Sequence, residues 1–184
     1  MIGHDCLETE LKITADHIAE NGGKENWIID SNHDRHIERY IQEGRDRKDP
    51  KNALIASELL VGSIRNKVSC LEYYFSKRIP KKYKFINPNK KADVKGIDLS
   101  QHGDRGANGA RGSAKGFANL SSRTVVGHSH TPQIEKGCWQ VGTSTRNLEY
   151  AVGYSSWLEC DCLIYKNGKR AMVMYINGKS IFDV

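Results

Sequence analysis

The alternation of apolar and polar positions divides the chain into a mixed first half and a strand-rich second half. In the first half, apolar residues recur at helical spacing in three segments, and a short apolar run interrupts them. Asp49-Pro50 is a plausible helix start, because aspartate caps helices and proline fits the first turn. Helices are therefore predicted over residues 5–21, about 35–43 and about 49–75, and a buried strand over 26–30.

The second half is punctuated by turn residues between short apolar runs. Candidate strands cover 96–101, 123–127, 134–141, 158–165 and 170–176, with a helix near 112–120. Asn167-Gly168 predicts a hairpin between the last two strands, and Asn177-Gly178 marks a further turn. The pattern predicts an α/β fold whose C-terminal strands are mostly antiparallel.

Composition narrows the class of protein. A chain of 184 residues with 27% charged residues fits one globular domain, over 1–184. Its net charge of +6 and pI near 9.0 favour an anionic partner, such as a phosphate ester or nucleic acid, or simply a basic soluble surface. No membrane span or signal peptide is expected, and five cysteines without a disulfide spacing favour a reducing cytoplasm.

Basic residues are densest over 77–95, where Tyr83 and Phe85 lie between lysines. Aromatic rings stack on bases and lysines meet phosphates, so this stretch is a candidate nucleic-acid-contacting insertion. A solvated hairpin or loop is the alternative.

Two histidine clusters carry most of the chemical information. Asn32-His33-Asp34 follows the apolar run 27–29, and His128 and His130 follow the apolar run 124–126. His102 comes after another apolar run, in Gln101-His102-Gly103-Asp104. Imidazole and amide oxygen are ligands for Mn, Fe, Zn or Ni, so three strand ends that deliver them predict a shared metal site at one sheet edge.

These motifs resemble the Gly-Asn-His-Asp and Gly-His-x-His signatures of calcineurin-like metallophosphoesterases, with His102 as the lone histidine between them. The resemblance implies a four-layer αββα sandwich and a dinuclear centre of two divalent ions, with Mn preferred and Zn, Fe, Ni or Mg possible. It implies that Asn32, His102 and His128 hold the second metal and that His130 helps hold the first. His33 would be the general acid, supported by Asp34.

The resemblance implies a phosphodiesterase or nuclease, and the match extends to phage-type members of the family, which places the protein in a host cytoplasm. The chain departs from the family in two places. Ser31 replaces the glycine before Asn32, and the Asp-x-His and Gly-Asp-x-x-Asp motifs are not found upstream of Asn32. Those motifs carry most ligands of the first metal and the bridging carboxylate, so the chain corresponds to the C-terminal two-thirds of such an enzyme.

Two functional interpretations follow. In the first, the chain is a metal-dependent phosphoesterase whose missing ligands come from a complementing N-terminal segment or a partner chain. A homo-oligomer is a further candidate assembly. In the second, it is an incomplete fragment or pseudoenzyme that binds an anionic ligand, nucleic acid or a partner chain without turnover.

The glycine-rich block over 103–113 is the last chemical candidate. Its backbone can approach a phosphate closely, and Arg105 and Arg111 are candidate phosphate-binding residues. It is not a Walker A loop, because the Gly-Lys-Ser/Thr ending is absent. A flexible surface loop is the alternative.

Overall fold

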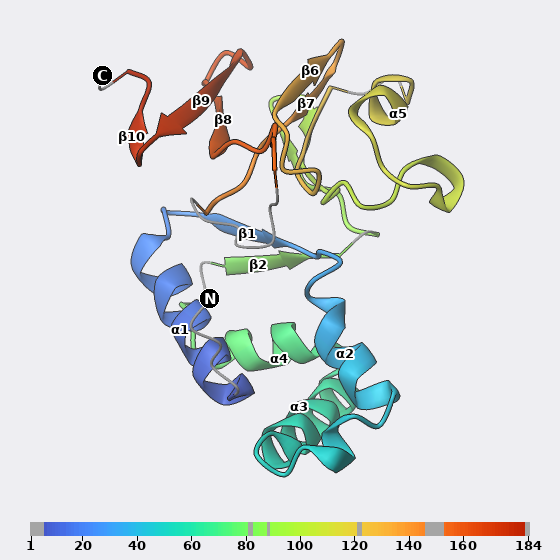
Figure 1. Ribbon diagram of the computed structural model, residues 1–184. Helices are drawn as coiled ribbons and strands as arrows, with labels where there is room; N and C mark the ends of the chain where they lie inside the picture. Colours follow the sequence, from blue (N-terminus) through green and yellow to red (C-terminus); the bar gives the residue numbers. More distant parts are fainter. Residues whose placement is uncertain (1–5, 81–82, 88, 121–122, 146–152, 183–184) are drawn as a thin grey trace. The chain divides into compact units, whose positions relative to one another are not determined.

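The computed structural model describes residues 6–80, 83–87, 89–120, 123–145 and 153–182. The chain forms two compact units, Met1–Phe85 and Ile86–Val184, which we describe separately. Figure 1 shows their elements in chain order. The prediction of one phosphoesterase domain over 1–184 stays a prediction.

Helices dominate the first unit, and one small two-stranded sheet accompanies them. The sheet pairs β1 with β2, whose last residue belongs to the second unit. Apolar side chains from α1, α3 and α4 form the core, among them Leu11, Leu59 and Phe75. The elements are α1 (Leu7–Asn21), β1 (Asn26–Ile29), α2 (Arg35–Gln42), α3 (Ala53–Asn66), α4 (Cys70–Ser76) and β2 (Tyr83–Ile86).

The prediction of one helix over about 49–75 is wrong, because two helices occupy this stretch. Lys67 adopts a left-handed conformation, with φ of 55°, and ends α3. Ser69 then caps α4, since its side chain accepts a hydrogen bond from the Glu72 amide at 3.1 Å. Asp49 is not the cap of α3, which begins at Ala53.

The basic stretch 77–95 contains residues of both units, and its assignment as an insertion or loop stays a prediction. It contains β2 and β3 (Asp93–Val94). Arg78 lies over the Tyr74 ring at 3.7 Å, and Lys84 forms an ion pair with Glu25 at 2.5 Å. Lys81 and Lys82 lie outside the described residues, so contact of this stretch with nucleic acid stays a prediction.

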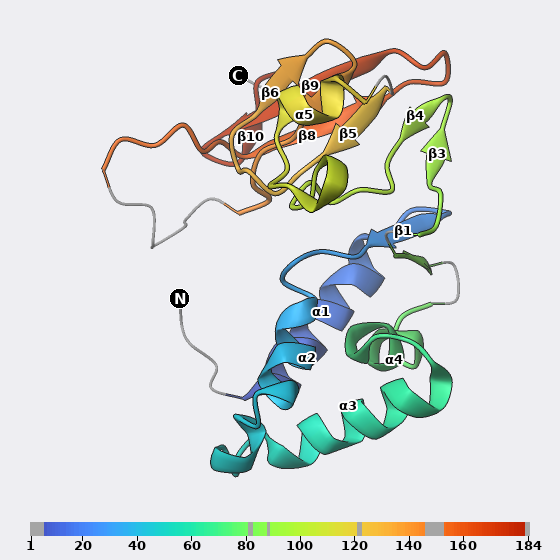
Figure 2. The same ribbon diagram turned by 90° about the vertical axis from the view of Figure 1, so that its right-hand side faces the viewer.

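A mixed five-stranded sheet forms the centre of the second unit, in the order β3-β4-β5-β7-β6. β5 is parallel to both β4 and β7, while β3 and β6 run antiparallel to their neighbours. The short helix α5 lies over this sheet (Figure 2), where Phe117 packs with Val126 and Cys138. The elements are β4 (Ile97–Asp98), α5 (Ala114–Ala118), β5 (Thr124–Val126), β6 (Gln133–Glu135) and β7 (Cys138–Gln140).

The C-terminal strands form an antiparallel sheet, β10-β9-β8, as predicted. Its strands are β8 (Cys160–Ile164), β9 (Arg170–Ile176) and β10 (Lys179–Ser180). Asn177 and Gly178 both have positive φ, 51° and 72°, as a two-residue type I′ hairpin requires. At the other hairpin only Gly168 has positive φ, and Tyr165 and Lys169 close a three-residue loop.

The strand predicted over 134–141 is instead a hairpin, because Lys136 has φ of 49° and turns the chain between β6 and β7. The α/β class is confirmed, while the four-layer sandwich stays a prediction. Within the described residues, no helix is both long and apolar enough to span a membrane.

Candidate metal-binding histidines

His102 and His128 meet at the carboxyl ends of two neighbouring parallel strands. Asp98 of β4 is in register with Thr124 of β5, so the loops after both strands leave the sheet at the same edge. The two imidazole rings lie 5.3 Å apart between centroids, at an interplanar angle of 76°. The Gly127 amide also donates a hydrogen bond to the His102 carbonyl at 2.7 Å. The sequence-based expectation that these strand ends converge is met, and metal binding by the pair stays a prediction.

The backbone after β5 is strained at both histidines of the Gly-His-x-His motif. His128 and His130 have φ of 72° and 63°, in the left-handed region that L-residues other than glycine seldom adopt. Such strain costs about 1 kcal/mol or more at each residue and concentrates at functional sites. The turn therefore holds two imidazoles in a conformation that packing must maintain.

Gln140 provides part of that packing. This buried residue of β7 donates one hydrogen bond to the Thr131 carbonyl at 2.8 Å and another to the Ser129 hydroxyl. It thereby anchors the residues on either side of His130. Sequence reasoning did not give Gln140 this role, although a polar residue between apolar positions of a buried strand was the available signal.

His130 is braced by a different segment. Its ring lies against Trp157 with centroids 4.7 Å apart and planes nearly perpendicular, at 85°. Its carbonyl accepts a hydrogen bond from the Leu158 amide at 3.2 Å. Nowhere in the described part of the chain do three or more His, Cys, Asp or Glu side chains form a group that could hold a metal ion. The observed arrangement is a pair of imidazoles, with His130 placed two residues beyond His128.

The glycine-rich block serves first to bring backbone segments together beside this pair. A Cβ on Gly103 would lie 2.8 Å from the Gly127 carbonyl oxygen, and the φ of Gly103 is 115°. A Cβ on Gly112 would lie only 1.8 Å from the Gly103 carbonyl oxygen. Glycine is needed at both positions because no side chain fits between these backbones. The backbone at Gly103, in the loop that carries His102, is thus held between Gly112 and Gly127.

Arg105 and Arg111 lie opposite each other in this block, joined by an isolated antiparallel bridge. Both are exposed, and the Arg105 guanidinium lies 3.8 Å from the Asp104 carboxylate. The two arginines are placed on one short ribbon, so they can act on the same ligand. Their role in phosphate binding stays a prediction.

In the first unit, a reciprocal capping pair shapes the turn that carries Asn32 and His33. The Ser31 amide donates to the Asp34 carboxylate at 2.7 Å, and the Asp34 amide donates to the Ser31 hydroxyl at 3.3 Å. Burial raises the pKa of Asp34, with the hydrogen bonds from Ser31 acting in the opposite direction. Ser31 does not adopt positive φ, so the glycine-to-serine difference causes no backbone strain.

His33 lies at the surface of this turn, immediately before α2. Its ring stacks on His36 with centroids 5.2 Å apart, and its carbonyl accepts from the His36 amide at 2.9 Å. Asp34 acts on the turn through Ser31, which fixes where the backbone presents His33. The roles predicted for Asn32, His33 and Asp34 in metal binding and proton transfer stay predictions.

Comparison with known proteins places the chain near a phage protein. No family model matches the chain, and no solved structure matches it. The chain is 31% identical over 163 residues to Protein A1 of Escherichia phage T5. That match covers 83% of this chain and 29% of Protein A1, so the chain spans less than a third of the relative's length. The chain is therefore a distant relative of a phage protein.

Proposed function

We propose that this chain is part of a metal-dependent phosphoester hydrolase, a phosphodiesterase or nuclease with a dinuclear metal centre. The observation that carries the proposal is the His102–His128 pair, two imidazoles 5.3 Å apart at the ends of parallel strands. Ligands and catalytic groups of open α/β sheets are commonly found at this edge. The left-handed backbone of His128 and His130 adds a second sign of a functional turn.

The donor set fits divalent metals of the Mn, Fe, Ni and Zn series, because neutral imidazole is a good ligand for these ions. In the proposal His102 and His128 are ligands of one metal, together with the Asn32 amide oxygen, and His130 is a ligand of the other. When bound, the ions would supply an acidified water and neutralise charge on the phosphate. The preferred metal is Mn, by the resemblance to the metallophosphoesterases.

His33 would donate a proton to the leaving oxygen. It is exposed at the surface of the turn, where it can reach a substrate, and the Ser31–Asp34 capping pair fixes the backbone on both sides of it. Histidine is the residue type most often found in such proton transfer. Arg105 and Arg111 would bind phosphate oxygens.

The bridging carboxylate is the part that this sequence does not supply. The family's Asp-x-His and Gly-Asp-x-x-Asp motifs are not found upstream of Asn32. In the proposal, polypeptide outside this sequence provides those ligands, in the same protein or in a partner. The length of the T5 relative, of which the chain covers 29%, is consistent with further polypeptide in such proteins.

A second candidate function follows from the same sequence observation. Without the bridging carboxylate, the chain would bind an anionic ligand, nucleic acid or a partner chain without turnover. Its net charge of +6 favours this alternative as well, because phosphates attract basic surfaces regardless of catalysis.

The test is hydrolysis of bis-p-nitrophenyl phosphate and of DNA by the full chain with Mn²⁺, alongside its metal content. His33→Asn should remove turnover and leave metal content unchanged, because His33 is assigned to proton transfer and not to ligation. His128→Asn should remove both. Asparagine is chosen at 128 because it tolerates positive φ better than alanine does.

His17→Asn is the matched control, since His17 is exposed on α1 and has no assigned role. It should behave as the wild type in both assays. Equal metal loss in the His33 and His128 variants would contradict the assigned roles. DNA binding without hydrolysis, measured by mobility shift, would support the second candidate function instead.

A further inference from the structure

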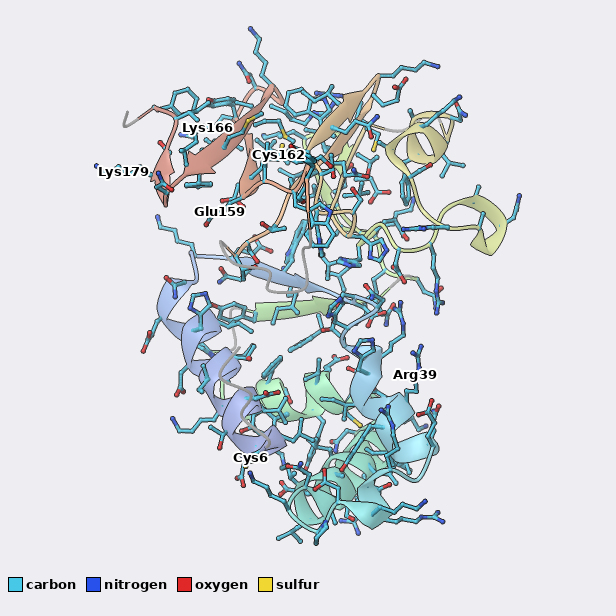
Figure 3. All side chains as sticks on the ribbon, viewed as in Figure 1. Cys6, Arg39, Glu159, Cys162, Lys166 and Lys179 are labelled. Carbon is cyan, nitrogen blue, oxygen red and sulfur yellow. The ribbon has the colours of Figure 1, made fainter. Side chains whose placement is uncertain are left out.

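A cavity of about 770 Å³ lies within the first unit, among α1, α2 and α4. Figure 2 shows α1 and α2 close together, and Figure 3 labels Arg39 on α2 and Cys6 just before α1. Its volume falls within the ~300–1,000 Å³ typical of small-molecule sites. The proposed function gives no role to this cavity, although His33 and Asp34, which have roles in the proposal, are among its lining residues.

Part of the cavity has apolar walls. They are formed by side chains from all three helices, namely Leu7, Leu11, Ile37, Leu71 and Phe75. Several of these belong to the core of the unit or pack against it, so the walls are fixed by packing. A flat apolar group would be desolvated here by rigid surfaces.

Polar groups gather where α2 begins. His33, His36 and Arg39 line the cavity at spacings of three residues, and the rings of the two histidines are stacked. Arg45 also lines it, over the Tyr40 ring at 5.6 Å and in an ion pair with Glu43. The acidic side chains of the lining are Glu10 and Asp34, and Asp34 already accepts the Ser31 amide.

We infer that this cavity binds a nucleotide, with its base between the apolar walls and its phosphate at Arg39 and the two histidines. A base has a flat apolar face and a phosphate is an anion, which matches an apolar cavity with a cationic end. The inference rests on the proposed function in one respect. His33 would protonate the leaving group, so a cavity that His33 lines is where a nucleoside leaving group would lie. The substrate class is thereby narrowed from phosphate esters in general to nucleic acid or nucleotides.

The test is isothermal titration calorimetry of the full chain with 5′-deoxyadenosine monophosphate, in the presence of EDTA. We expect the nucleotide to bind at least about tenfold more tightly than deoxyadenosine or inorganic phosphate, because each of these makes only part of the contacts. Octyl phosphate serves as a further probe, because it carries the same phosphate on a non-aromatic chain. Equal binding of octyl phosphate would overturn the nucleotide class.

Two adjacent residues of α1 provide a matched pair of variants. Thr14 lines the cavity, whereas Ile13 is not among its lining and is 52% exposed. Thr14→Trp should fill the cavity and weaken nucleotide binding by about tenfold or more, while Ile13→Trp should change it less than about twofold. Equal effects of the two variants, or no binding of the nucleotide by the wild type, would overturn the inference.

Arg39→Gln gives a second, milder test, because Arg39 is exposed and its loss should not unfold the unit. It should weaken binding of the nucleotide by about tenfold and leave binding of deoxyadenosine unchanged, since only the phosphate meets the guanidinium. Loss of both affinities equally would contradict the placement of the phosphate. Binding is measured in EDTA and hydrolysis in the separate Mn²⁺ assay, so the two proposals can fail independently. Nucleotide binding with no hydrolysis in the Mn²⁺ assay would refute the proposed activity alone. Hydrolysis in that assay with no nucleotide binding would refute this inference alone.

Discussion

Gly112 lies where a side chain has no room, and replacing it tests how the loop that carries His102 is held. An alanine Cβ at this position would lie 1.8 Å from the Gly103 carbonyl oxygen. Carbon and oxygen in close contact need roughly 3.3 Å, so the two backbones would have to separate by about 1.5 Å, the difference of those distances. Overpacking of this kind costs ~1–3 kcal/mol, and we expect the upper end because neither partner is a flexible side chain.

Gly106→Ala is the matched control in the same block. Gly106 has φ of −92°, and a Cβ there would meet its nearest neighbour, the Arg111 carbonyl oxygen, at an ordinary 3.4 Å. We expect this variant to differ from the wild type by less than ~0.5 kcal/mol or to be slightly more stable, because alanine restricts the unfolded chain.

Urea unfolding followed by tryptophan fluorescence measures both variants. Trp27 should be replaced by phenylalanine throughout, so that Trp139 and Trp157 report on the second unit alone. With a slope of about 2 kcal/mol per molar urea, a loss of about 3 kcal/mol lowers the midpoint by about 1.5 M. Equal midpoints for Gly112→Ala and Gly106→Ala would refute the argument that close backbone approach fixes this loop.

Two further predictions concern the first unit. Hydrogen bonds from Asn52 and Tyr40 lower the pKa of Asp49 below its usual value near 3.8. Ionised Asp49 therefore stabilises the fold above the unfolded pKa, and this stability is lost as the pH falls through the lowered pKa. Tyr40→Phe should weaken that acid dependence, which urea midpoints between about pH 2 and 6 would show, and an unchanged dependence would contradict it. Burial raises the pKa of the Cys70 thiol to about 12, whereas Cys6 is partly exposed, so a thiol reagent at pH 8 should modify Cys6 first. Peptide mapping would show the order, and early modification of Cys70 would contradict the packing of α4.

Strong local patterns predicted several elements well, and the exceptions have local physical causes. The strand over 170–176 matches β9, and the Asn177-Gly178 turn has the conformation that its residues favour. The break between α3 and α4 was missed because apolar spacing continues across it. The signal was Ser69 followed three residues later by Glu72, a capping-box pattern inside an apparent helix.

At the candidate site, too, local sequence predicted some features and not others. The local pattern was sufficient to predict that His128 follows one buried strand and that His102 follows another strand. The local pattern could not predict that β4 and β5 are parallel neighbours, because strand order depends on long-range pairing that local sequence does not encode. The left-handed backbone of His130 was equally hidden, since histidine carries no preference strong enough to predict it.

The most direct test of the central claim is equilibrium dialysis of the full chain against Mn²⁺ and Zn²⁺, with bound metal measured by mass spectrometry. The wild type and His17→Asn should bind equally, whereas His102→Asn and His128→Asn should each weaken binding by about tenfold or more, because each removes one of two paired imidazoles. Zn²⁺ should bind more tightly than Mn²⁺ at imidazole ligands, whereas the preference for Mn concerns the ion that supports hydrolysis. The same metal affinity in all four proteins would contradict the claim that this histidine pair is a metal site.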